Sequence, residues 1–393
     1  MTSPLSRLSR ALSGKAWPWI AAGLGLLILV SAASRYLVAD GHDFQAYYYA
    51  AQRLLHGESP YRYQVEYAFK YPAVFALAFA PFALFPYDVA RTLYTILHAA
   101  LALALPWGVW RFARGENTSP LLAPRFRVGV IVAFVASFRF VDNEFQISQI
   151  GLWTFAAMLG GLACLRRAPR AAPTALGTTL FTLGAVTKVH SLVAFVAFGR
   201  AAAWRRWAPY ALLALAVVLL PSPEHWLDWA RQMKLTTPDL PTPPYARNVQ
   251  GFYPMAVTLF GWSALGYAPL LLALPFFVAA FLALPRFDLA DARSQPAALF
   301  LTVATWLTLG CLSSPLPWHY TYSFAWAVLP LSWAVASRAE RRGLLALALF
   351  LGLTPKGIIG FDVAAFLEGR QSVAIVFLLL GLIFARQARR LAR

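Results

Sequence analysis

The sequence has few charged residues and few cysteines for a chain of 393 residues. Charged residues make up only 13% of it, about half the usual share in soluble proteins. The two cysteines, Cys164 and Cys311, lie in apolar runs and give neither a disulfide framework nor a metal-ligand spacing. Because 60% of the residues are apolar and the mean hydropathy is +0.58, the sequence excludes a soluble globular enzyme, a disordered chain and a disulfide-rich secreted domain. It indicates a polytopic membrane protein.

Familiar cofactor signatures are also missing from the sequence. It contains no glycine-rich phosphate loop and no dinucleotide-binding fingerprint. It shows no convincing Ser/His/Asp order and no His/Cys metal cluster. The net charge of +18 would suit nucleic acid, but basic residues beside apolar spans ordinarily orient a protein in its membrane. We therefore expect no cofactor, no metal site and no nucleic-acid partner.

Apolar runs between charged residues predict about twelve membrane-spanning helices, since a span needs roughly 20 residues. The predicted spans begin near Trp17, Asp88, Arg127, Gly151, Thr174, Val189, Trp207, Tyr253, Gln295, His319, Gly343 and Gln371. Residues 174–200 are short for two crossings and fit two half-length helices that meet near Lys188. A cleaved signal peptide is an alternative for the first run, but its length favours an uncleaved helix.

Charge asymmetry predicts the orientation of these spans. If residues 71–85 do not cross, 22 of the 34 Lys and Arg residues fall on one side with only four acids, and the other side holds 12 of each sign. The positive-inside rule then places both termini in the cytoplasm. We expect an all-α bundle that forms a single domain over residues 1–393, in the inner (plasma) membrane. Its first outer loop, residues 39–87, carries juxtamembrane helices, and a second long outer loop covers residues 222–253.

Polar side chains then gather on the predicted outer face, from loops far apart in the sequence. They include Asp40, His42, Asp43, Glu144, Gln149, Lys188 and His319. Ionisable groups at membrane level are costly and mark functional sites. Purely structural explanations also exist, because Asp40 and Asp43 suit helix caps, Lys188 suits snorkelling to the interface, and His319 suits an interfacial position.

A carboxylate, cations and aromatic residues on one face fit glycosyl transfer from a lipid-phosphate sugar. An aspartate can deprotonate an acceptor hydroxyl as it attacks the anomeric carbon. A lysine or histidine can stabilise the negative charge on the departing phosphate. Such a donor enters from the bilayer and needs no nucleotide-binding fold.

Ordered motifs in the chain resemble glycosyltransferase family 87. The first-loop motif is Asp43-Phe44-Gln45-Ala46-Tyr47-Tyr48-Tyr49-Ala50-Ala51, followed by Gly57 and Pro60-Tyr61. Tyr71-Pro72 is similar to the family's Tyr-Pro-Pro, with Ala73 in place of the second proline. Ser148-Gln149-Ile150-Gly151 is similar to its Gly-Gln-x-Asn, with the glycine and the asparagine replaced. Thr187-Lys188, Asn248-Val249-Gln250 and Ser314-Pro315-Leu316-Pro317-Trp318-His319-Tyr320 resemble its later motifs.

The resemblance implies a fold and a set of roles. It implies a bundle of the GT-C superfamily and a polyprenyl-phosphate-mannose-dependent hexosyltransferase that inverts the anomeric carbon. Asp43 would be the general base, and Lys188 and His319 would contact the donor phosphate. Asp40, His42, Tyr48, Gln149 and Glu144 would line the sugar or acceptor pocket. The expected partners are a polyprenyl-phosphate sugar, a lipid or glycan acceptor, and the membrane.

Two other functions are compatible with a polytopic membrane protein. A transporter or lipid flippase would show two halves with matching interrupted helices and charges near the midplane. The sequence has no convincing internal repeat, and its ionisable residues fall near the ends of spans. A scaffold protein would leave the outer carboxylate, lysine and histidine without a shared purpose.

Overall fold

A computed structural model describes most of the chain. The described residues are 16–39, 41–62, 68–114, 122–167, 171–199, 208–213, 216, 223–236, 250–260, 268–288, 291–314 and 319–393. Of the predicted features, these lie outside the described residues: Asp40, residues 63–67 of the first outer loop, the start of the span predicted near Trp207, parts of the second outer loop (222 and 237–249), and residues 315–318 of the last motif.

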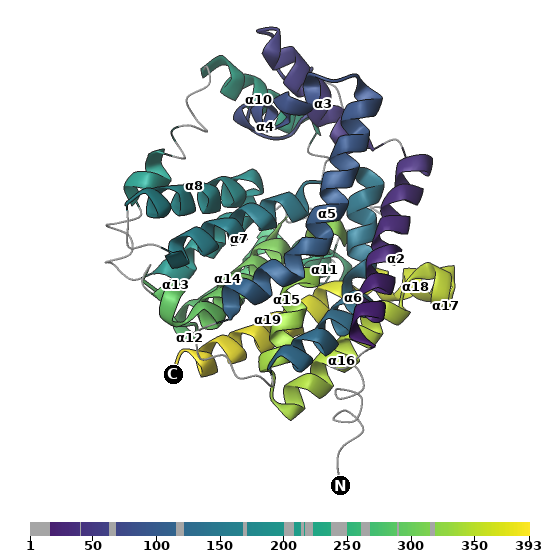
Figure 1. Ribbon diagram of the computed structural model, residues 1–393, viewed down its shortest axis with the longest axis vertical. Helices are drawn as coiled ribbons and strands as arrows, with labels where there is room; N and C mark the ends of the chain where they lie inside the picture. Colours follow the sequence, from purple (N-terminus) through teal and green to yellow (C-terminus); the bar gives the residue numbers. More distant parts are fainter. Residues whose placement is uncertain are drawn as a thin grey trace.

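The described part of the chain is built from helices (Figure 1). In chain order they are α2 (Trp17–Val38), α3 (His42–Leu55), α4 (Val74–Ala83), α5 (Tyr87–Ala113), α6 (Leu122–Ile147), α7 (Gly151–Arg167), α8 (Ala171–Thr187), η1 (Val189–Phe198), α10 (Pro223–Thr236), α11 (Phe252–Phe260), η4 (Ala268–Ala273), α12 (Leu274–Ala283), α13 (Asp291–Ser294), α14 (Pro296–Ser313), η5 (His319–Tyr322), α15 (Ala325–Val335), α16 (Arg338–Leu353), α17 (Lys356–Ile359), α18 (Phe361–Gly369) and α19 (Ser372–Leu391).

Several helices are long and apolar enough to cross a membrane. Four of them, α2, α5, α14 and α19, pass this test alone, and α6 and α7 pass it as a pair bent by 111°. With the high apolar content, these helices indicate a membrane protein. The count of twelve crossings and the GT-C arrangement remain predictions.

The predicted first outer loop contains two short helices, α3 and α4. Helix α4 has ten residues and an internal proline, Pro81, so it is about half the length of a membrane span. Both helices pack onto the start of α5 through an aromatic cluster, in which the ring of Phe44 stacks on Tyr94 with centroids 4.7 Å apart. This packing fixes the beginning of α3.

Helix α10 lies at the same end of the molecule as α3 and α4 (Figure 1). The indole of Trp229 donates a hydrogen bond of 3.0 Å to the carbonyl oxygen of Lys70. The Ser59 hydroxyl donates one of 2.9 Å to Asp228. Helix α2 begins, and α19 ends, toward the opposite end of the molecule (Figure 1).

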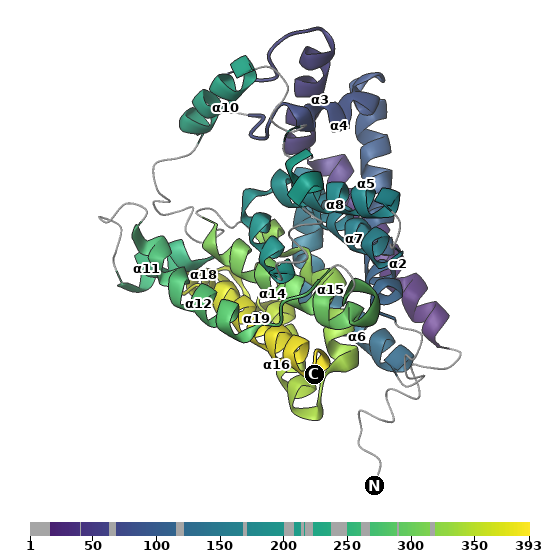
Figure 2. The same cartoon turned by 90° about the vertical axis from the view of Figure 1, so that its left-hand side faces the viewer.

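Helices α14 and α15 form the buried centre of the bundle, with α19 and α6 alongside (Figure 2). Small residues allow the helices to approach closely. A Cβ atom at Gly129 of α6 would lie 2.7 Å from the carbonyl oxygen of Pro330 in α15. One at Gly161 of α7 would lie 2.6 Å from the carbonyl oxygen of Gly177 in α8. These contacts hold α6 against α15 and α7 against α8.

Candidate active site

The bend between α6 and α7 is the centre of the site. Ser148 adopts a left-handed conformation with φ of 57°, which favours glycine and is strained for other residues. The backbone N–H of Gln149 donates a hydrogen bond to the backbone carbonyl oxygen of Glu144 at 3.0 Å. The Tyr94 hydroxyl donates one to the backbone carbonyl oxygen of Gln149 at 2.7 Å. The bend is therefore held by hydrogen bonds to the backbone of Gln149.

Glu144 lies beneath this bend and is completely buried. Its carboxylate accepts hydrogen bonds from the Ser323 hydroxyl at 2.7 Å and from the Gly151 amide at 3.1 Å. The His98 Nε2 atom is 3.8 Å from the same carboxylate. A buried carboxylate with several partners fixes the elements around it, so Glu144 joins α5, α6, α7 and the turn before α15.

Gly151 brings Glu144 close to Lys188. A Cβ atom at position 151 would overlap Glu144 Oε1 and would lie 3.2 Å from Lys188 Nζ. The lysine and the carboxylate thus approach the same point from two sides.

Lys188 occupies the junction between α8 and η1 in an extended conformation. This junction is where the sequence predicts that two short helices meet. The ammonium group lies 5.1 Å from the centroid of the Tyr320 ring, a cation–π contact. Among the described residues, it forms no ion pair within 4 Å of a carboxylate, so its charge is available to a ligand.

Asp43 lies in the first turn of α3, directly beside the bend. Gly41 directly precedes α3 and has φ of 60°, and a Cβ atom there would lie 3.0 Å from Ser148 Oγ. Asp43 is half-buried. The loss of solvation raises the pKa of its carboxyl group to about 7, while the charges of Lys70 and Lys188 lower this pKa and that of Glu144 raises it. Asp43 and Lys188 are therefore electrostatically coupled.

A cavity of about 210 Å³ opens at this point. It is lined by Lys70, Tyr71, Pro72, Gln149, Val186, Thr187, Lys188, His190, Trp229, Met233, Tyr320 and Thr321. The buried side-chain oxygen of Gln149 has no hydrogen-bond partner among the described residues, so it can accept a bond from a ligand hydroxyl. The cavity thus combines two lysines, an amide and aromatic rings.

The structure brings some of the predicted residues to this cavity and places others elsewhere. Gln149 and Lys188 line it, and Asp43 lies close enough to act on its charges. Glu144 is buried behind Gly151 and is not among the lining residues. His42 is solvent-exposed, and Asp40 lies outside the described residues.

Tyr48 and His319 have other contacts. The Tyr48 hydroxyl donates to the carbonyl oxygen of Phe85 at 2.8 Å and accepts from the Gln52 amide at 2.9 Å. The His319 ring packs edge-on against Phe140, with centroids 6.1 Å apart. It is the next two residues, Tyr320 and Thr321, that line the cavity.

Ten of the twelve lining residues were not selected from the sequence as site residues, and Lys70, Tyr71, His190 and Tyr320 are the ionisable ones among them. Lys70 and Tyr71 immediately precede Pro72 of the Tyr-Pro motif, and His190 follows Lys188 by two positions. Their position beside these motifs, on the same predicted outer face, was the available signal. Within the described residues, no group of three His, Cys, Asp or Glu side chains could hold a metal ion.

Comparison with known proteins identifies one family. The model of glycosyltransferase family 87 matches residues 69–315, which include Gln149 and Lys188 but not Asp43 or His319. No curated protein matches the chain. No solved structure matches it.

Proposed function

The chain belongs to glycosyltransferase family 87, and from this we propose that it transfers a hexose from a polyprenyl-phosphate donor to a lipid or glycan acceptor. The motif resemblance favours mannose as the sugar. In this reaction the acceptor hydroxyl oxygen attacks the anomeric carbon, and the bond from that carbon to the donor phosphate breaks. Asp43 takes the hydroxyl proton, and polyprenyl phosphate leaves with the bonding electrons. A single displacement of this kind inverts the anomeric carbon.

The cavity with its two lysines is the observation that carries this proposal. Lys70 and Lys188 line the same cavity, and neither forms an ion pair with a described carboxylate. Lys188 is half-buried and Lys70 is solvent-exposed, and unpaired cations beside a departing phosphate stabilise its growing negative charge. Asp43 is close enough for both lysines to lower its pKa, so base and phosphate contacts share one site.

The other predicted residues take supporting roles. Gln149 offers an unpaired buried oxygen to a sugar hydroxyl. Glu144, paired with Ser323 and the Gly151 amide, holds the wall next to Lys188. We assign the second phosphate contact to Lys70 rather than to His319, because Lys70 lines the cavity and His319 does not.

We also propose that the site faces the outer side of the inner (plasma) membrane, with both termini in the cytoplasm. This orientation puts the basic clusters on the inner side. The placement of α3, α4 and α10 at one end, away from the start of α2 and the end of α19 (Figure 1), supports it.

The direct test incubates the purified protein with radiolabelled polyprenyl-phosphate sugars and a membrane lipid extract, and looks for a labelled product. Asp43→Asn should lower turnover by about 10²–10⁴-fold, the usual contribution of a general base. Lys188→Ala should raise the KM for the donor more than that for the acceptor, and Lys188→Arg should restore part of the loss. Near-normal turnover of Asp43→Asn would remove Asp43 from the mechanism. Absence of product with every sugar donor would remove the proposed reaction.

A further inference from the structure

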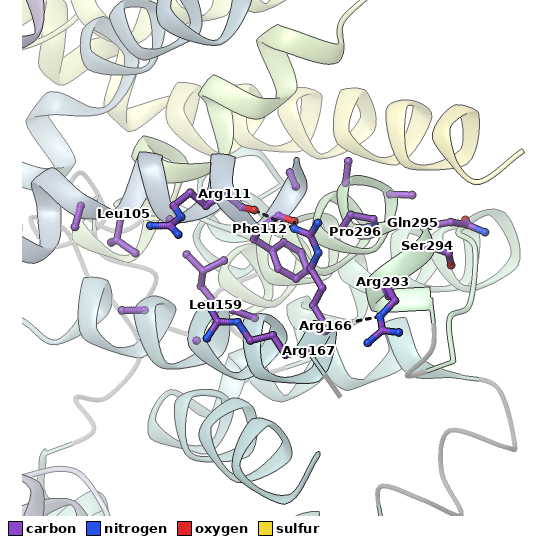
Figure 3. A pocket seen from close by; sticks show the side chains of 18 of the residues that line it. Leu105, Arg111, Phe112, Leu159, Arg166, Arg167, Arg293, Ser294, Gln295 and Pro296 are labelled. Atoms are coloured by element: carbon purple, nitrogen blue, oxygen red, sulfur yellow. Dashed lines mark hydrogen bonds between the residues drawn. The ribbon is translucent and has the colours of Figure 1, made fainter. Parts of the chain in front are cut away.

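A second and larger cavity has its basic end far from the candidate active site. Its volume is about 1430 Å³, and it is lined by residues of α5, α7, α13 and the start of α14 (Figure 3). Two of its basic residues, Arg166 and Arg167, end α7, whereas Gly151 begins that helix. At 1.5 Å per residue, Gly151 and Arg167 are separated by about 24 Å along the axis. The cavity therefore does not belong to the site described above.

Four arginines line this cavity: Arg111 and Arg167 lie to one side of Arg166, and Arg293 lies to the other (Figure 3). Within the described residues, none of the four forms an ion pair with a carboxylate. Four like charges around one space repel one another and create a strong positive potential. An anionic ligand would relieve this repulsion.

Arg166 has a structural role. Its guanidinium donates hydrogen bonds to the carbonyl oxygens of Arg111 at 2.9 Å and Arg114 at 2.6 Å, and also to that of Phe112. These are the last carbonyl groups of α5, which have no partner within their own helix. Arg166 thus caps α5, and it is not a residue to mutate in a binding test.

The other three arginines remain available to a ligand. The side chains of Arg111 and Arg167 donate no hydrogen bond to a described residue, and Arg293 donates only a long one of 3.5 Å, from Nε to the Arg166 carbonyl oxygen. The start of α14, Gln295 and Pro296, lies at the same cavity. The positive end of its helix dipole adds to the attraction for an anion.

The remaining wall of the cavity is apolar. On α5 it includes Leu101, Leu105 and Phe112, and on α7 it includes Leu159. From Leu101 to Arg111, α5 rises by about 15 Å, which is half the thickness of a bilayer's hydrocarbon core of about 30 Å. A ligand that contacts both the arginines and the apolar wall has an anionic head group and an apolar chain about one leaflet long.

We propose that this cavity binds an anionic phospholipid, with its anionic head group at the end lined by the arginines and an acyl chain along α5 and α7. Basic pockets between membrane helices are suited to anionic head groups. Free inorganic phosphate would satisfy the arginines but would leave the apolar wall uncovered. Occupancy by a lipid would join α5, α7 and α14, and it would stabilise the folded protein by mass action.

The test measures lipid binding to the delipidated full-length protein by native mass spectrometry. Phosphatidylglycerol is titrated against wild type and against Arg111→Gln/Arg167→Gln/Arg293→Gln. We expect the affinity to fall on the order of 100-fold in this variant, since each basic residue contributes about fivefold at an anionic surface. The matched control is Arg338→Gln/Arg342→Gln/Arg389→Gln, which removes the same charge from three exposed arginines outside the cavity. Equal losses in both variants would overturn the proposal.

Two further arms separate a lipid from a free anion. Ala104→Phe adds a ring at an exposed position of the apolar wall, so it should weaken phosphatidylglycerol binding while the protein remains folded. Phosphatidylcholine should bind much more weakly than phosphatidylglycerol to wild type. The lipid proposal would be contradicted if inorganic phosphate bound as tightly as phosphatidylglycerol and Ala104→Phe left lipid binding unchanged. The cavity would then be a phosphate site.

Discussion

The pKa of Asp43 sets the pH dependence of the proposed reaction, and the charged residues around Asp43 change this pKa. Burial raises the pKa of this carboxyl group to about 7, and a general base must be ionised to accept a proton. We therefore expect kcat/KM to fall as the pH drops below about 7, and to level off above it. Lys70 lowers the pKa of Asp43, so in Lys70→Gln the acid limb of the pH–rate profile should move to higher pH.

Arg62→Gln is the control for this pH profile. Arg62 is an exposed basic residue in the same loop, and it is not among the charges that act on Asp43. Its profile should match that of wild type. An acid limb that stays in place in Lys70→Gln, or moves to lower pH, would contradict the assignment of the base.

Gly151 is required because no side chain fits between Glu144 and Lys188. A Cβ atom there would overlap the Glu144 carboxylate, so Gly151→Ala must displace one of the two groups. We expect a loss of about 1–3 kcal/mol in stability, as for other overpacked sites, together with a lower rate of transfer. Thermal unfolding and the transfer assay measure the two effects.

Gly160 of the same helix provides the matched substitution. A Cβ atom at Gly160 would meet only Leu180 Cδ1, at 4.0 Å. Alanine is favoured over glycine inside a helix by about 0.5–1 kcal/mol, so Gly160→Ala should leave stability unchanged or raise it. Similar behaviour of the two alanine variants would contradict the close approach of Glu144 and Lys188.

At the scale of elements, the position of η1 depends on its contact with α14. A Cβ atom at Gly310 would overlap the His190 carbonyl oxygen and lie 2.8 Å from Val193 Cγ2. Because the obstructing atom belongs to the backbone, Gly310→Ala should push η1 away from α14 and move Lys188 with it. We expect a higher KM for the donor and a loss of stability of about 1–3 kcal/mol.

The control for η1 is Gly343→Ala in α16, where the nearest atom to a Cβ is Ile383 Cδ1 at 3.8 Å. This variant should bind the donor as wild type does. A Gly310→Ala protein with normal donor KM and normal unfolding temperature would show that Lys188 does not depend on this contact.

The sequence predicted the elements of the site better than the direction of individual side chains. The apolar runs around Lys188 are too short for two spans, which correctly indicated a junction of short helices. Tyr47 and Tyr48 are adjacent, yet only Tyr47 reaches Tyr71, with ring centroids 5.6 Å apart, while Tyr48 bonds to Phe85. The rotation of α3 decides between them, and it follows from the tertiary packing of Phe44 rather than from the local sequence. Likewise, the local sequence does not show which of the adjacent His319 and Tyr320 rings lines the cavity, because tertiary packing decides it.

At the scale of the whole molecule, hydropathy reveals the membrane protein but not the number of crossings. Apolar helices of 10–17 residues, such as Thr174–Thr187 and Leu271–Ala283, are shorter than the roughly 20 residues of a span. An apolar run indicates that a segment is buried, but it does not show whether the segment is buried in lipid or in protein. Helix α14, which is largely enclosed by other helices, shows that a run long enough to span can also be the core of the bundle.

Charge asymmetry predicts which end of the molecule faces the cytoplasm, because the predicted inner segments hold 22 basic residues and four acids. Single cysteines introduced as Glu58→Cys and Arg342→Cys, at exposed positions before α4 and in α16, test it in a background of Cys164→Ser and Cys311→Ala. An impermeant maleimide should label position 58 in intact cells and position 342 only after permeabilisation. The unsubstituted background reports any unspecific labelling. Labelling of position 342 in intact cells would invert the topology, and labelling of both positions there would place α3 and α16 on one side, contrary to an outer site with cytoplasmic termini.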